Sequence, residues 1–148
     1  MNTLNFKPTF LGQCIIKYQV PLDIFMSINQ IYEQNYNSLA PANGQLVGKI
    51  EKEHSLFYHG EDQTKMKNHN FLPKNVTDYF MQVFNHYLKF NAIQDYKTHL
   101  NSIWVNEMKQ HEYNPAHIHR GMLFTGLSSV MILKLPSTYG KEYSAGHI

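Results

Sequence analysis

Two histidines separated by one residue, His117 and His119, have the residue type and spacing best suited to metal chemistry in this sequence. In an extended strand the side chains at positions i and i+2 leave the same face, so both imidazoles can bind one ion without unusual backbone geometry. Neutral imidazole is the commonest protein ligand of transition metals such as zinc and iron. The chain has nine histidines, so the pair alone is a weak indication, and its surroundings decide the interpretation.

Two apolar segments flank the histidine pair. Residues 102–108 predict a strand that places Trp104 and Asn106 on one face. A polar side chain on an apolar face needs a hydrogen-bond partner or costs about 1 to 3 kcal/mol. Asn106 should therefore either line a wet cavity or be satisfied by backbone groups. A polar link at 109–115 leads to the histidines, and a second apolar strand is expected at 128–135.

The preceding hundred residues contain the elements that must position these segments. We expect a short strand within 10–20 and a helix over 22–34, where apolar residues recur at helical spacing. Residues 35–70 read as a polar connection with at most a short strand at 45–50. A clearer helix follows at 75–88. Its broad aromatic stripe is interpreted as core that packs against a sheet.

Six other histidines receive no metal-binding role. Those in or near the second helix should serve packing and capping (His86 and His99), and those in the polar connection should lie at the surface (His54, His59 and His69). His111 should either contact a metal ligand without binding the metal itself or be exposed to solvent.

Composition limits the class of protein. A chain of 148 residues with 43% apolar, 14% aromatic and 16% charged residues predicts one globular domain. A net charge of +2 with scattered lysines argues against a nucleic-acid partner. Cys14 is the single cysteine, which excludes an internal disulfide and a cysteine-rich zinc module and fits a reducing compartment. We find neither a membrane-spanning run nor a signal-peptide pattern, so we expect a soluble cytoplasmic protein.

The segment from Trp104 to Pro136 resembles a known family. Trp104-Val105-Asn106, the run EYNPAHIH over 112–119, and SSVMILKLP over 128–136 are similar to three motifs of the small iron(II)- and 2-oxoglutarate-dependent oxygenases predicted in marine bacteria and tailed phages. Those motifs are a W-x-N strand, a G-D/E-Y-N-P-x-H-x-H turn and an S-G-V-x-Y-L-K-x-P strand. Before Trp104 the resemblance is loose.

The resemblance implies a fold and a chemistry. The fold class would be α+β: a partial double-stranded β-helix, which is a jelly-roll or cupin-like fold, with N-terminal helices packed against the sheet. Residues 1–148 would form a single domain, with 1–100 as a helical support region that includes an N-terminal strand, and 101–148 as the first strands of the β-helix. Such proteins use Fe(II), oxygen and 2-oxoglutarate to hydroxylate a C–H bond, which requires three protein ligands on one side of the metal and three open positions.

The resemblance also implies residue roles. His117 and His119 would be metal ligands. Three residues are expected to bind 2-oxoglutarate (Lys134, Asn106 and Met131), and four to contact the substrate or support the ligands (Trp104, Tyr113, Asn114 and Arg120). For Lys134 the plainer alternative is a solvated lysine at a strand end.

The sequence departs from the wider oxygenase superfamily in two ways. His119 stands where a carboxylate is usual, which places more positive charge on the metal and favours either another metal or an added anion. The usual third ligand is a later histidine, followed by an arginine or lysine that binds 2-oxoglutarate. The sequence ends 29 residues after His119, and His147 is the only histidine in that stretch. We therefore expect an oxygenase that is incomplete at its C-terminus, possessing full activity only at full length.

Two other classes of function stay open. One is a cupin-like module that binds a divalent metal without turnover, although no glutamate follows His119 at the three to six residues typical of cupins. The other is a structural or assembly protein whose open strand edges form a homodimer. The substrate, whether a small molecule or a protein side chain, is not specified by these residues, and no membrane or nucleic-acid partner is expected. A phage-encoded protein would act in the host cytoplasm.

Overall fold

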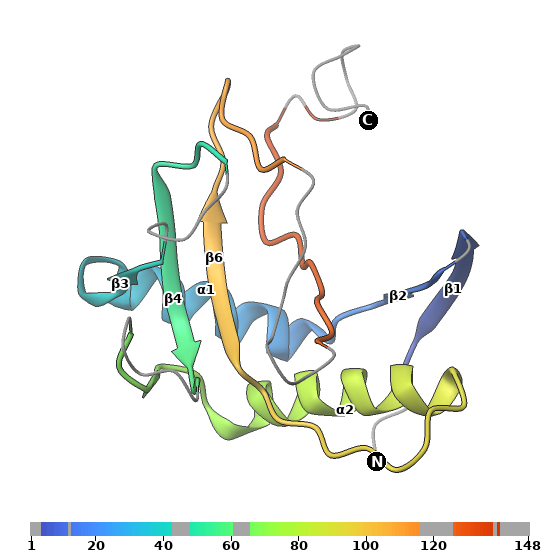
Figure 1. The fold of residues 1–148 in the computed structure, drawn as a ribbon. Helices are drawn as coiled ribbons and strands as arrows, with labels where there is room; N and C mark the ends of the chain where they lie inside the picture. The colour runs from blue at the N-terminus through green and yellow to red at the C-terminus, as the bar shows by residue number, and fades with distance from the viewer. Residues whose placement is uncertain are drawn as a thin grey trace. The chain divides into compact units, whose positions relative to one another are not determined.

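The structure is a computed structural model that describes residues 4–11, 13–42, 48–60, 66–115, 126–137 and 139. The chain divides into two compact units, Met1–Ile118 and His119–Ile148. The first unit contains, in order, β1 (Phe6–Leu11), β2 (Gln13–Tyr18), α1 (Leu22–Asn35), the 3-10 helix η1 (Tyr36–Ser38), β3 (Ala40–Pro41), β4 (Lys52–Tyr58), β5 (His69–Asn70), α2 (Lys74–Phe90) and β6 (Ser102–Glu107). The fold is α+β, with two α-helices and antiparallel sheets (Figure 1).

The larger sheet has four strands and is built around β4. β6 pairs with β4 along its whole length, from Lys52 opposite Glu107 to Tyr58 opposite Ser102, with one register shift at Ser55–Phe57. The two-residue strands β3 and β5 also pair with β4. They must use the opposite edge of β4, because β6 occupies one edge from end to end.

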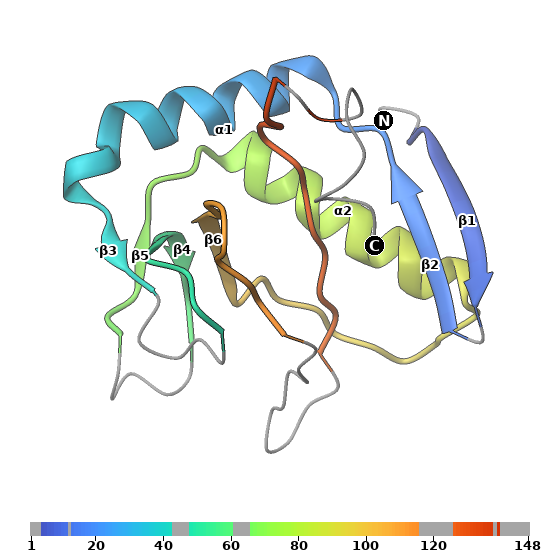
Figure 2. The same ribbon diagram turned by 90° about the horizontal axis from the view of Figure 1, so that it is seen from above.

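The two α-helices confirm the helical periodicity of the sequence. α1 follows Pro21 and buries Ile24 and Ile28, which lie one helical turn apart. α2 extends the predicted range slightly at each end and buries Val76, Tyr79, Val83 and Leu88. The helices contact each other, and α1 passes behind β4 and β6 in Figure 1 and to one side of these strands in Figure 2. Neither described helix combines the length and the apolar character needed to cross a membrane.

β1 and β2 form an antiparallel hairpin, where the sequence predicted one short strand. Aromatic rings join this hairpin to the end of α2: Phe6 lies 4.6 Å from His86 and 5.9 Å from Phe90, between ring centroids. Tyr18 donates to or accepts from Nδ1 of His86 at 2.8 Å. The prediction that His86 has a packing role is thereby confirmed.

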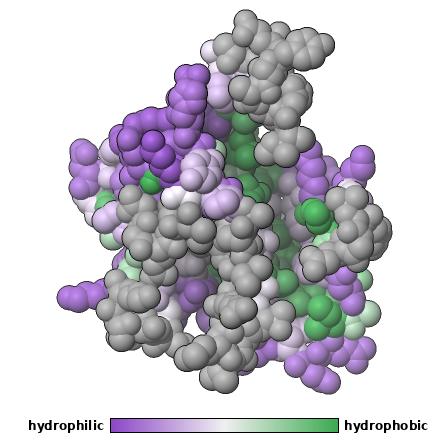
Figure 3. All heavy atoms as spheres, turned by 45° about the horizontal axis from the view of Figure 1, so that its top comes forward, coloured by the Kyte–Doolittle hydropathy of each residue, from purple (hydrophilic) through white to green (hydrophobic). Residues whose placement is uncertain are grey.

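The hydrophobic core of the first unit combines residues of the sheet and of both helices. Leu56 of β4 and Val76 of α2 are fully buried, and Ile24 and Ile28 of α1 are nearly so. Hydrophobic residues also reach the surface in several places on the face that Figure 3 draws. Among the large ones, Leu22 is 73% exposed at the start of α1.

Two sequence-based expectations about strands were wrong. The sequence predicts a polar connection where β4 lies, because the inward positions of β4 include Glu53 and Ser55, which hide the apolar alternation of a buried strand. Residues 128–135, predicted as an apolar strand, are not a strand. Met131 and Leu133 are half-buried while Val130 and Ile132 are exposed, so the side chains alternate as in a strand, but without a ladder of backbone hydrogen bonds. The described strands form open sheets and not a closed barrel.

Candidate functional site

One face of the larger sheet is polar and carries two predicted site residues. Directly paired residues of antiparallel strands point to the same side. The register pairs Asn106 with Glu53 and Trp104 with Ser55, so these four residues share what we call the polar sheet face. Glu53 and Ser55 are 6% and 2% exposed, whereas Trp104 is 39% exposed. The predicted shared face of Trp104 and Asn106 agrees with this register.

The side chain of Asn106 has an arrangement that the sequence did not anticipate. Its amide hydrogen-bonds the carboxyl group of Glu53, and its Oδ1 is buried without a partner among the described residues. Burial raises the pKa of Glu53, and the hydrogen bond from Asn106 partly opposes this. The amide group of Asn106 is thus hydrogen-bonded to another side chain, where the sequence predicted a wet cavity or backbone partners.

The turn after β6 is organised by Glu112. Its two carboxylate oxygens accept hydrogen bonds from the backbone N–H of Lys109 at 2.7 Å and of Glu51 at 3.0 Å. These bonds hold the pKa of Glu112 below its usual range. The acidic residue of the sequence motif therefore ties the turn to the chain entering β4.

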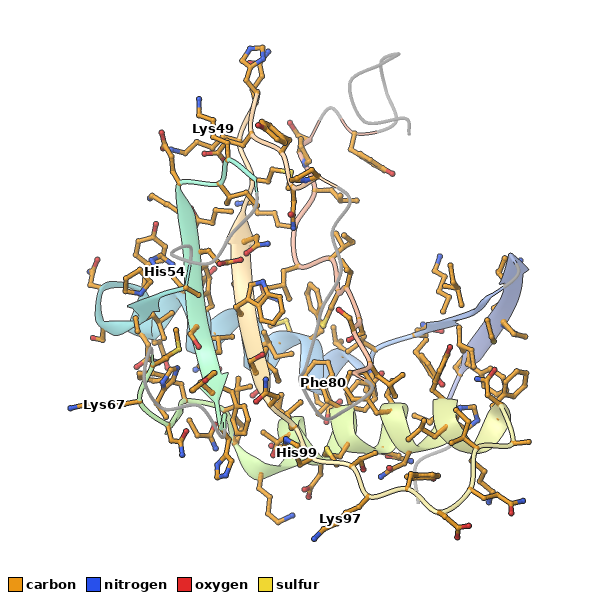
Figure 4. The ribbon with its side chains drawn as sticks, viewed as in Figure 1. Lys49, His54, Lys67, Phe80, Lys97 and His99 are labelled. Carbon is orange, nitrogen blue, oxygen red and sulfur yellow. The ribbon has the colours of Figure 1, made fainter. Side chains whose placement is uncertain are left out.

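Two further features define the path of this turn. His111, immediately before Glu112, has a left-handed backbone with φ of 67°. Next, Tyr113 and Lys49 form an antiparallel bridge: the Lys49 N–H donates to the Tyr113 carbonyl with an N to O distance of 2.9 Å, and the Tyr113 N–H donates to the Lys49 carbonyl at 3.1 Å. Figure 4 shows Lys49 beside the turn that follows β6. Gly48 packs so closely here that an added Cβ would lie under 3.0 Å from the Tyr113 carbonyl oxygen and from Pro115 Cδ.

The remaining predicted site residues divide into three groups. Tyr113 and Asn114 lie in the turn and are exposed. Met131, half-buried, and Lys134, exposed, belong to the second unit, so the structure does not place them against Trp104 and Asn106. Four candidates lie outside the described residues: the predicted ligands His117 and His119, Arg120, and His147. Within the described part of the chain, no group of three His, Cys, Asp or Glu side chains could hold a metal ion.

Sequence reasoning missed a cluster at the other face of the sheet, formed by Tyr32, Tyr36, Lys52, His54 and Glu107, which we call the Tyr–His cluster. Tyr32 Oη lies 2.9 Å from His54 Nδ1 and donates to Glu107 Oε1 at 2.9 Å. Tyr36 donates to the other oxygen of Glu107 at 3.5 Å. Lys52 Nζ lies 3.8 Å from Glu107 and hydrogen-bonds the hydroxyl of Tyr36.

Two histidines predicted at the surface are instead half-buried in strands. His54 belongs to the Tyr–His cluster, and His69 hydrogen-bonds Ser55 Oγ through Nε2 and the carbonyl of Lys67 through Nδ1, both at 2.8 Å. The surface prediction holds for His59, which is exposed. No sequence signal separated the three, because the burial of His54 and His69 depends on strand pairing.

Comparison with known proteins leaves the family open. No protein-family model matches this chain, and searches of curated proteins and of solved structures find no significant match.

Proposed function

We propose that this chain belongs to a non-haem Fe(II)- and 2-oxoglutarate-dependent oxygenase, with His117 and His119 as metal ligands. The observation that carries the proposal is the backbone at His111. The motif of the resembled family has a glycine immediately before its acidic residue, and His111 occupies that place with φ of 67°. Glycine adopts this conformation without cost, so the turn has the shape that the family's glycine would serve.

The anchoring of the turn supports the same proposal. Glu112 and Tyr113, two consecutive residues of the motif, both bond to the chain just before β4. Pro115 follows, and the histidine pair comes two residues later. A metal site needs ligands held by rigid elements, and β6 together with this turn would provide that support. In this proposal the four-stranded sheet is one part of a double-stranded β-helix.

The residues of this chain would share the work as follows. The bound metal, with oxygen and 2-oxoglutarate, supplies the oxidising power for C–H hydroxylation. His117 and His119 would bind the metal through neutral imidazoles. Lys134 and Met131 remain the proposed contacts of 2-oxoglutarate. Asn106 remains the third proposed contact: its NH2 group has two hydrogens, so one bond to Glu53 leaves the other for the anionic co-substrate.

The test is metal content. The purified chain is loaded with Fe(II) without oxygen, dialysed and assayed for bound iron. We expect the His117→Ala/His119→Ala double variant to lose the iron, while a matched control that removes two exposed histidines, His59→Ala/His99→Ala, retains it. Unchanged iron in the first variant would refute the proposal.

Turnover separates the proposal from its alternatives. Iron binding with conversion of 2-oxoglutarate to succinate in air supports the oxygenase. Binding of a divalent metal without succinate identifies a metal-binding module of the cupin type. A chain that binds no metal and self-associates would be a structural or assembly protein.

A further inference from the structure

The Tyr–His cluster contains a hydrogen-bond chain whose direction can be deduced. Tyr32 Oη donates a hydrogen bond to Oε1 of Glu107 at 2.9 Å. The tyrosine hydroxyl has one hydrogen, and that hydrogen must point at Glu107, because otherwise two oxygen lone pairs would face each other. The oxygen of Tyr32 therefore accepts the second hydrogen bond, at 2.9 Å, from Nδ1 of His54.

This direction determines the tautomer of His54. A neutral imidazole has one N–H, and in His54 it must sit on Nδ1 to donate to Tyr32. Nε2 then carries the free lone pair. No described residue donates a hydrogen bond to Nε2, and the His54 side chain as a whole is half-buried. Figure 4 shows His54 beside β4, on the side where β3 and the end of α1 lie.

The residues around these hydrogen bonds hold Tyr32, Glu107 and His54 in place. Burial, followed by the hydrogen bond to Glu107, raises the pKa of Tyr32, so its hydroxyl stays neutral and can pass a proton. Lys52 Nζ lies 3.8 Å from Oε2 of Glu107, on the side of the carboxyl group away from Tyr32's bond to Oε1. The rings of Tyr32 and Tyr36 lie 5.8 and 4.9 Å from that of His54 and restrict its rotation.

We propose that His54 is a second reactive site, whose Nε2 accepts an acyl group from an activated ester or anhydride, with Tyr32 and Glu107 as its proton relay. The inference is independent of the proposed metal site. In the step, the Nε2 lone pair forms a bond to the carbonyl carbon, and the bond from that carbon to the leaving oxygen breaks. The Nδ1 proton moves to Tyr32 as the proton of Tyr32 moves to Glu107, so the acylated imidazole is neutral. This is the arrangement of an activated nucleophile with an oriented base.

Another histidine supplies an internal contrast. His69 also has its hydrogen on Nδ1, since Nδ1 can only donate to the carbonyl of Lys67. Its Nε2 is occupied by Ser55 Oγ at 2.8 Å, and Ser55 is 2% exposed. Nε2 is therefore occupied in His69, whereas in His54 no described residue bonds to it.

The test is the rate at which each histidine reacts with diethyl pyrocarbonate near neutral pH, resolved by mass spectrometry of peptides from the whole chain. We expect His54 to react faster than the exposed His59 and His99, and His69 to react slowest. In Tyr32→Phe the rate at His54 should fall about tenfold, as expected when an orienting partner is lost. The matched control, Tyr18→Phe, removes the hydrogen bond of a tyrosine to His86 and should leave His54 unchanged.

A rate at His54 no higher than at His59, or one unaffected by Tyr32→Phe, would overturn the inference. If the variant fails to fold, a second measurement tests the same inference without a substitution. It is the side-chain ¹⁵N spectrum of the unmodified chain. We expect the Nδ1–H tautomer for His54 at neutral pH. The Nε2–H tautomer would overturn the relay regardless of any variant.

Discussion

At the scale of single residues, the unusual feature of this protein is a buried carboxyl group with no cationic partner among the residues that the structure describes. Glu53 is 6% exposed, and its hydrogen-bond partner is the neutral amide of Asn106. A buried carboxylate that lacks a cationic partner is destabilised in its charged form. Such a residue lowers the stability of the folded state at pH values where its carboxyl group is charged.

Glu53→Gln should change how stability varies with pH. Burial raises the pKa of Glu53 in the folded state, so its contribution to stability is complete below the unfolded pKa of about 4.3 and is lost as pH rises through the folded pKa. Relative to the natural chain, the variant should gain stability over that range, by about 1.4 kcal/mol for each unit by which the two pKa values differ. Urea unfolding at several pH values measures the gain.

The control for this prediction is Glu33→Gln on the exposed surface of α1. It makes the same chemical change at an exposed position, so it measures the effect of removing one carboxyl group without burial. If Glu53→Gln ran parallel to this control, Glu53 would titrate alike in the folded and unfolded states.

At the scale of elements, the turn formed by residues 108–115 continues β6 toward the proposed ligands in the sequence. It depends on the backbone at His111, the carboxylate of Glu112 and the close contact with Gly48. Two substitutions examine opposite effects on this turn.

His111→Gly should stabilise the chain by about 1 kcal/mol, because a left-handed backbone strains a residue with a Cβ and does not strain glycine. The measurement is the free energy of unfolding in urea. His99→Gly, at an exposed residue without a positive φ, should not stabilise the chain. A loss of stability in His111→Gly would mean that the left-handed turn is not populated.

Gly48→Ala should destabilise the chain by about 1 to 3 kcal/mol, the usual cost of overpacking. Its Cβ would lie under 3.0 Å from Tyr113, Asn114 and Pro115, so the segment leading to the histidines must move. If the metal proposal holds, iron binding should weaken as well. Gly126→Ala is the comparison, since its Cβ would meet nothing within 4 Å. Equal stability of the two variants would contradict this packing.

At the scale of the whole molecule, unpaired strand-like backbone predicts self-association. β6 pairs only with β4 among the described strands, and in the second unit Val130 is 87% and Ile132 59% exposed. Open edges and apolar extended segments pair readily with another chain.

We expect a concentration-dependent homodimer in sedimentation velocity experiments. Val130→Lys/Ile132→Lys should shift the chain toward monomer, because charged side chains block edge pairing. The same double substitution at exposed polar positions, Asn37→Lys/Gln94→Lys, is the control for added charge. A natural chain that stays monomeric at all concentrations would rule out association through this segment.

Local patterns predicted much of the fold. The helical spacing of apolar residues placed α1 and α2 within one or two residues of their ends, and the alternation around Trp104 placed β6. The same reasoning missed β4, the central strand, because polar residues occupy its buried positions. It also predicted a strand at 128–135, where the side chains alternate but no described segment pairs with the backbone.

By itself the sequence determined the two helices and the strand β6. It also showed that a strand with a tryptophan is followed by a turn with two histidines, and this order suggested metal chemistry. These features arise from residues a few positions apart, whose periodicity is set by local backbone geometry. Only the tertiary structure decided that Glu53 is buried, that His111 is left-handed, and that Tyr32 connects His54 to Glu107. The last contact joins residues 75 positions apart, and no local pattern records which distant side chains a fold will bring within hydrogen-bond distance.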